Sequence, residues 1–139
     1  MIRRSVLLLL ATTVHACFAQ NDLKVSIVLN KPEAGGMLRV ALCSSKVAFD
    51  SEKGCKLLSA PADAHVVTVT YTDLPAGEYA VKVFHDINSD SELNTSWIGW
   101  PKEPYGFSND AAVNMGPPPY RFAAFQMKDG LNSIRIALR

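Results

Sequence analysis

The chain has 139 residues, 48% of them hydrophobic, which is enough to bury the core of one domain. Its 14 basic and 13 acidic residues nearly cancel, and no segment gathers Lys and Arg into the basic face that nucleic-acid binding requires. We therefore expect a single domain with no nucleic-acid partner.

Residues 1–19 have the organisation of a secretory signal peptide. Two arginines precede an apolar stretch at residues 5–14, and small residues occupy the two positions before Gln20 that a signal peptidase reads. The stretch is too short to cross a bilayer as a permanent helix, and no second stretch predicts an integral membrane segment. We predict cleavage before Gln20 and a mature domain of residues 20–139.

The cysteines indicate the compartment. Removal of residues 1–19 leaves Cys43 and Cys55, and such a pair in an oxidising compartment usually forms a disulfide. This disulfide would stabilise the domain by about 3 kcal/mol on the chain-entropy model, whereas the alternative is two separate buried thiols. A lipoprotein signal with an acylated Cys17 is the alternative to simple cleavage, but His15 is bulky for such a signal. We expect a secreted or periplasmic protein.

Five segments alternate apolar and polar residues with a period of two, which is typical of antiparallel sheets with one side in water. They cover residues 23–29, 38–42, 67–72, 79–83 and 134–138. We also expect a less regular strand at residues 120–127 and a helical turn near residues 47–52. Six or seven short strands predict an all-β fold, a single antiparallel two-sheet sandwich of the prealbumin-like or immunoglobulin-like kind with one long ordered loop.

The long loop covers residues 85–109, where short polar residues, Gly and Pro are too dense for a regular strand or helix. Its aromatic residues argue against disorder, and a long ordered loop in a compact domain is usually functional. We therefore place the functional face at residues 85–120. The candidate binding residues on this face are His85, Asp86, Asn88, Asp90, Trp97, Trp100, Glu103, Tyr105 and Asn109.

Three oxygen-bearing residues of the loop, Asp86, Asn88 and Asp90, have the spacing of the first ligands in a calcium-binding loop. Ser91 stands where such a loop has glycine, and Trp97 stands where it has a bidentate glutamate. The alternative is a hydrogen-bond network in which these side chains accept from nearby backbone N–H groups. Calcium is thus the one candidate ion, and no other cofactor is expected.

The loop also suggests an acid–base site, since His85, Asp86 and Glu103 are the residue types that general acid–base catalysis uses. No nucleophile elbow, zinc-protease or phosphate-binding pattern accompanies them. We therefore expect His85 to fix the loop by hydrogen bonding, and a small hydrolase is the alternative. The loop aromatics have two interpretations as well: they pack the loop onto the sandwich, or they form a platform for a sugar or peptide.

Several motifs in fixed order resemble a bacterial exported family known as domain of unknown function 2141. They are LPAGEYAV at residues 74–81, FHDIN at 84–88, LNT at 93–95, GWPKE at 99–103, YGFSN at 105–109 and GPP at 116–118. The resemblance covers roughly residues 22–138 and implies an exported sandwich, with a turn into a strand like that of prealbumin-like and carboxypeptidase-regulatory domains. The family pattern has Asn-Gly and a final Asp where this chain has Asp90-Ser91 and Asn94.

From these observations we expect a non-catalytic, exported binding or structural domain of the cell envelope that acts through residues 85–120. The alternative is a calcium-stabilised module that binds carbohydrate or peptide. The expected partner is an envelope protein, a peptide or a glycan.

Overall fold

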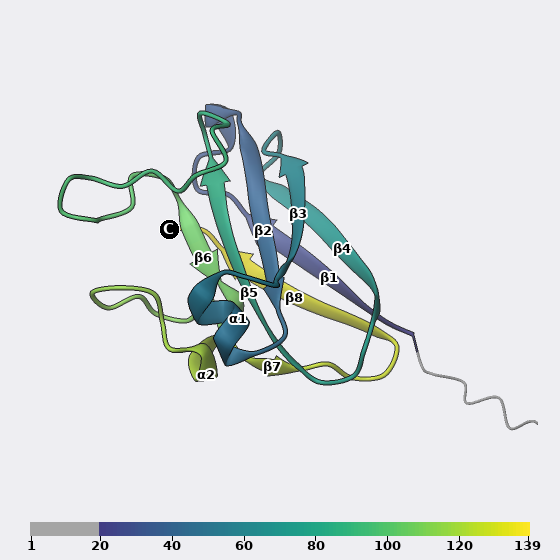
Figure 1. Cartoon of the computed structure of the whole chain (residues 1–139). Helices are drawn as coiled ribbons and strands as arrows, with labels where there is room; N and C mark the ends of the chain where they lie inside the picture. Colours follow the sequence, from purple (N-terminus) through teal and green to yellow (C-terminus); the bar gives the residue numbers. More distant parts are fainter. Residues whose placement is uncertain (1–19) are drawn as a thin grey trace, which may run out of the picture.

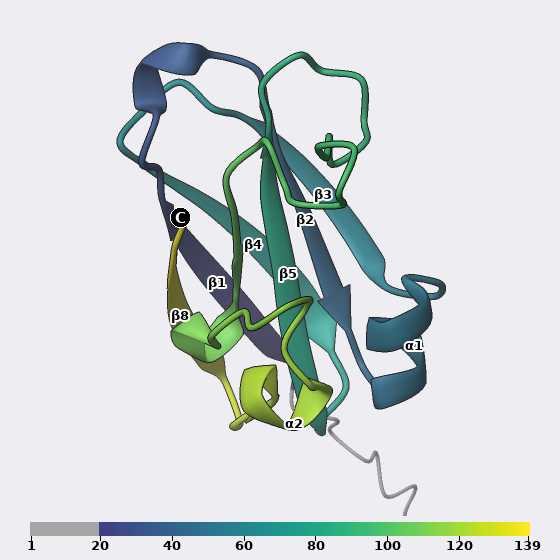
Figure 2. The same ribbon diagram turned by 90° about the vertical axis from the view of Figure 1, so that its left-hand side faces the viewer.

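The computed structural model describes residues 20–139, which form two β-sheets packed face to face (Figures 1 and 2). The predicted signal segment, residues 1–19, and Cys17 within it lie outside the described residues. Within residues 20–139, no helix has the length and apolar character needed to span a membrane.

The chain passes back and forth between the two sheets. The strands are β1 (Asn21–Val28), β2 (Met37–Cys43), β3 (Lys56–Pro61), β4 (Val66–Leu74), β5 (Glu78–Asp86), β6 (Tyr105–Phe107), β7 (Phe125–Gln126) and β8 (Leu131–Ala137). The helical segments are η1 (Pro32–Ala34), α1 (Lys46–Ser51), η2 (Ser108–Asp110) and α2 (Tyr120–Ala123).

One sheet has three strands in the order β4-β1-β8, and the other has five, with β3-β2-β5-β6 in line and β7 paired to β5. The prediction of an all-β two-sheet sandwich is confirmed. The expectation of purely antiparallel pairing holds for every pair among the described residues except β1 with β8, which is parallel. After the five-stranded sheet the chain returns to the other sheet, where β8 pairs with the open edge of β1 and runs in the same direction as β1.

Alternation along β5 decides which side chains face the core and which face outward. Tyr79, Val81 and Val83 belong to the apolar cluster between the sheets, as their period of two predicts. Lys82 and Phe84 alternate with them and point to the opposite, outer face, where they are half-buried. The outer face of the five-stranded sheet is therefore partly covered and is where the helices and long loops lie (Figure 2).

A second apolar cluster lies under α1 and α2. The Phe49 ring meets the Tyr120 ring edge-on at 5.6 Å, and Phe107 lies 6.0 Å away. The predicted helical turn is confirmed as α1, where the Ser45 side chain caps the helix by accepting from the Ala48 N–H at 3.1 Å. The predicted disulfide between β2 and the start of β3 is also present, with 4.4 Å between the Cα atoms.

The strand predicted at residues 120–127 is wrong for its first half. Residues 120–123 form α2, because one helical turn buries both Tyr120 and Ala123, three residues apart, in the second cluster. Only Phe125–Gln126 pairs as a strand, with the start of β5. β3 was not predicted, because this edge strand exposes Leu57 and lacks a clean apolar alternation.

Candidate functional site

The long loop leaves the sheet at the end of β5, where the Asp86 carboxylate is fully buried. One of its oxygens accepts from the Asp90 N–H at 3.0 Å, and the other accepts from the Ser91 N–H at 2.9 Å. The second oxygen also receives the Arg39 Nε–H at 2.8 Å, across the strand pair β2–β5. Asp86 thus turns the chain out of the sheet and holds the first residues of the loop.

A second buried carboxylate holds the loop from its other end. Glu103 is 7% exposed and accepts from the Ile87 N–H at 2.9 Å and from the Asn94 N–H at 3.0 Å. These two donors lie near the beginning and in the middle of the loop. A single side chain therefore ties three parts of the loop together, which explains how so long a segment stays ordered without regular structure.

The exposed Asp90 carboxylate forms the outermost part of this network. It accepts from the side-chain amides of Asn88 at 3.0 Å and Asn94 at 2.9 Å, and from the Glu92 N–H at 2.9 Å. The hydrogen bond from Asn94, followed by that from Glu92, lowers the pKa of Asp90 below its usual value.

The hydrogen-bond network expected as the alternative to a calcium site is therefore present. Asp86, Asn88 and Asp90 lie on one turn, as predicted. Their side-chain oxygens accept hydrogen bonds from N–H groups, so the hydrogens of those groups stand where a cation would bind. Among residues 20–139, no group of three or more His, Cys, Asp or Glu side chains is arranged to hold a metal.

The three residues of the hydrolase alternative lie near the end of β5, but their side chains make separate contacts. His85 points into the core, fully buried, and its Nε2 pairs with the Gly35 carbonyl on a different loop. Glu103 uses both oxygens for backbone N–H groups. His85 thus fixes the loop of Gly35 to the end of β5, and it shares no hydrogen bond with Glu103.

The middle of the long loop is a small hairpin, residues 94–102. Thr95 and Pro101 form a β-bridge, the Ser96 N–H donates to the Trp100 carbonyl at 2.7 Å, and the Lys102 N–H donates to Asn94 at 2.8 Å. The turn is closed by the Gly99 N–H, which donates to the Ser96 carbonyl at 2.9 Å. We call this segment hairpin 94–102. It projects from the sandwich beside a second projecting segment, loop 111–119 (Figure 1).

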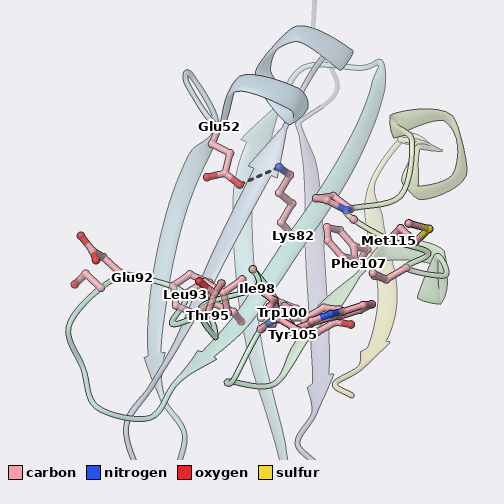
Figure 3. Close-up of a pocket in the computed structure, with 18 residues that line it drawn as sticks. Glu52, Lys82, Glu92, Leu93, Thr95, Ile98, Trp100, Tyr105, Phe107 and Met115 are labelled. Carbon is pink, nitrogen blue, oxygen red and sulfur yellow. Dashed lines mark hydrogen bonds and ion pairs between the residues drawn. The ribbon is translucent and has the colours of Figure 1, made fainter.

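A groove of about 770 Å³ lies on the outer face of the five-stranded sheet, between hairpin 94–102 and loop 111–119 (Figure 3). Its size falls within the range of ligand-binding pockets. The floor is made by Lys82, Phe84, Tyr105 and Phe107 of β5 and β6. The walls include Leu93, Thr95, Ile98, Trp100 and Pro101 on one side and Val113, Met115 and Pro117 on the other.

The groove is largely apolar, with the pair Lys82–Glu52 at one end and Glu92 also in its lining. At the end with the pair, Lys82 Nζ lies 3.2 Å from the carboxylate of Glu52, which follows α1 (Figure 3). Lys82 Nζ also lies 4.4 Å from the centre of the Phe49 ring. The Lys82 side chain is mostly buried, whereas Glu52 is well exposed. A ligand entering the groove would thus meet aromatic and aliphatic surface along most of its length and a paired cation at the end.

The structure divides the nine candidate binding residues into three groups. His85, Asp86 and Glu103 are buried supports, and Asn88, Asp90, Trp97 and Asn109 are exposed residues outside the groove lining. Asn109 donates to the Phe122 and Ala124 carbonyls and so anchors α2. Trp97 is exposed at the hairpin turn, and only Trp100 and Tyr105 line the groove.

Sequence reasoning missed most of the groove floor. Neither Lys82 nor Phe84 was among the candidate residues, because alternation says which residues share a face of a strand but not what covers that face. An aromatic residue at position 84, on the face opposite Val81 and Val83, was the available signal. Met115 lay within the predicted face of residues 85–120 but was not singled out.

Comparison with known proteins gives a family without an assigned activity. A family model described as "Uncharacterized protein conserved in bacteria (DUF2141)" matches residues 27–135. No curated protein and no solved structure matches the chain.

Proposed function

Because the chain belongs to the uncharacterised bacterial family DUF2141, we propose its function from the groove: it is an exported, non-catalytic binding domain of the cell envelope that takes an apolar peptide segment. The observation that carries the proposal is the groove itself, an open, mostly apolar channel on a rigid sheet, with Trp100 still 52% exposed at its wall. An ordered loop that keeps large apolar side chains in water is typical of a binding surface.

The lining favours a peptide over a glycan. Recognition of a sugar needs several converging polar side chains beside an aromatic platform. Here the walls are mainly aliphatic, aromatic or proline side chains, and the charged pair Lys82–Glu52 lies at one end. An extended segment with apolar side chains matches this arrangement along its whole length.

Two observations support export. The Cys43–Cys55 disulfide is typical of proteins outside the reducing cytoplasm. The predicted signal segment at residues 1–19 leads to the same compartment. Together with the bacterial family, these two features support an envelope location.

The character of the groove supports a binding role without catalysis. Among its lining residues, the charged side chains are Lys82, Glu52 and Glu92, and the first two are paired to each other. The buried His85, Asp86 and Glu103 are occupied in holding loops.

A selection of phage-displayed random peptides on the protein tests the proposal, followed by calorimetry with the enriched peptide made synthetically. Thr95→Trp fills the groove from its wall and is expected to weaken binding by about tenfold or more, since it displaces apolar contact worth over 1 kcal/mol. Thr70→Trp, the same substitution at an exposed position of β4 on the other sheet, is the matched control and should bind normally. Failure to enrich any peptide, or equal binding by both variants, would overturn the proposal.

A further inference from the structure

The two large apolar side chains with the greatest exposure in the described chain lie on the two segments that flank the groove. Trp97 is 96% exposed and Met115 is 91% exposed. Trp97 and Ile98 are the two central residues of the turn that Gly99 closes. Both segments extend from the same side of the sandwich as separate projections (Figures 1 and 2).

Trp97 is exposed although backbone hydrogen bonds hold the segment that carries it in place. Hairpin 94–102 is closed by its own backbone bonds, and its base is fixed where the buried Glu103 accepts from the Asn94 N–H. A hairpin closed in this way presents Trp97 almost wholly to solvent at its turn and leaves Ile98, beside the groove, 58% exposed. Such an arrangement is expected where the contact is made with something outside it.

The charge distribution indicates what that contact is. Residues 93–101 and residues 111–119 contain no charged residue, although 19% of the chain is charged. The charged residue that follows the first segment is a cation, Lys102, at the base of the hairpin. Two uncharged projections with Trp, Ile and Met at their ends match the boundary between lipid headgroups and acyl chains, where Trp is enriched.

We propose that hairpin 94–102 and loop 111–119 insert their ends into the surface of a phospholipid bilayer, so that the mouth of the groove faces the lipid. A planar surface can receive two separated projections at once without shape complementarity, and binding then depends on apolar area inserted more than on charge. This inference goes beyond the proposed function, because it concerns where the domain sits and not what the groove holds.

Flotation with vesicles of phosphatidylethanolamine and phosphatidylglycerol tests the inference on the protein as it is recovered after export. Trp97 and Trp100 are the two tryptophans of the whole chain, so fluorescence reports on the hairpin directly. We expect the wild type to float and its emission to shift to shorter wavelength. The double variant Trp97→Ser/Met115→Ser should lower the bound fraction by about tenfold or more, since each lost side chain is large and apolar. High salt should leave flotation of the wild type unchanged.

Matched variants separate lipid insertion from general stickiness and from the groove. Val47→Ser/Leu57→Ser removes two side chains that are 76% and 74% exposed elsewhere, on α1 and β3, and should float normally. Phe84→Ala, which alters the groove floor and lies outside both projections, should also float. All variants share one N-terminus, so a signal or acyl group there cannot cause a difference. Absence of wild-type flotation, equal flotation of Trp97→Ser/Met115→Ser, or its abolition by salt would overturn the inference.

Discussion

Replacing Asp86 by alanine should destabilise the whole domain and not only the loop. The substitution leaves three donors without their acceptor: the backbone N–H groups of Asp90 and Ser91, and Nε of Arg39. It also removes the Arg39–Asp86 ion pair, which joins side chains of the paired strands β2 and β5.

The magnitude follows from the exposure of each donor. Asp90 and Ser91 are exposed, so water can replace the carboxylate and each lost bond costs about 0.5–1 kcal/mol. The side chain of Arg39 is only 25% exposed and loses a charge-assisted bond, which costs about 1.5–3 kcal/mol. Removing the buried carboxylate also removes the desolvation cost of burying it, which offsets part of this sum. We therefore expect the free energy of unfolding to fall by about 2–3 kcal/mol. For a domain of this size that corresponds to a fall in Tm of about 10 °C.

Thermal and urea unfolding of the wild type, Asp86→Ala and Glu92→Ala measure this loss, each with calcium and with chelator. Glu92 is an exposed acidic residue of the same loop and serves as the control, with an expected change below about 0.5 kcal/mol. Calcium should not alter any of the three transitions, because N–H groups already occupy the carboxylate oxygens. The reasoning is refuted if Asp86→Ala unfolds like the wild type. A calcium-dependent rise in Tm that Asp86→Ala or Asp90→Ala abolishes would instead establish the cation site.

Three further predictions concern other parts of the structure. Reduction of Cys43–Cys55, which are 12 residues apart, should lower the free energy of unfolding by about 3 kcal/mol; an unchanged urea midpoint in reductant would contradict this. The pKa of Asp90 is lowered in the folded protein, so its contribution to the free energy of unfolding is complete above the unfolded value of 3.8 and is lost as the pH falls below that value. The difference in stability between the wild type and Asp90→Asn should therefore be constant near neutral pH and shrink below about pH 4. Unfolding curves of both proteins, measured across the acid range, would show this. Gly36→Ala should destabilise the domain by more than about 1 kcal/mol in urea unfolding, because Gly36 has a φ of +78° and a Cβ there would clash with the carbonyl oxygen of Asp86. An unchanged free energy of unfolding would mean that the backbone at the end of β5 can move away to accept the Cβ.

The strands that the sequence predicted well are those whose pattern is local. Val25 and Ile27 in β1 and Val81 and Val83 in β5 alternate with polar or half-buried residues, and burial follows that alternation. The parallel pairing of β1 with β8 joins the two ends of the described chain, and no local pattern encodes it. α2 was mistaken for a strand because a single helical turn is too short to show its period.

The predicted face of residues 85–120 supplies part of the groove lining, and the rest of the lining was not predicted. Density of polar residues identified the loop, and the carboxylates Asp86 and Glu103 proved to be its internal supports. Sequence spacing cannot tell whether such oxygens accept from N–H groups or hold a cation, since both uses need the same residue types. The groove depends on Phe84 from one element and Met115 from another, and only the folded chain brings them together.

The groove between hairpin 94–102 and loop 111–119 is the binding site that we propose. The most direct measurement is a backbone amide NMR titration of the protein with the peptide enriched by phage selection. We predict that the shifts which saturate with the peptide map to Lys82, Phe84, Tyr105 and the two flanking segments, while Lys24, Thr68 and Thr70 on the opposite sheet stay unchanged. Saturable shifts confined to β1 and β4, with the groove unperturbed, would contradict the account.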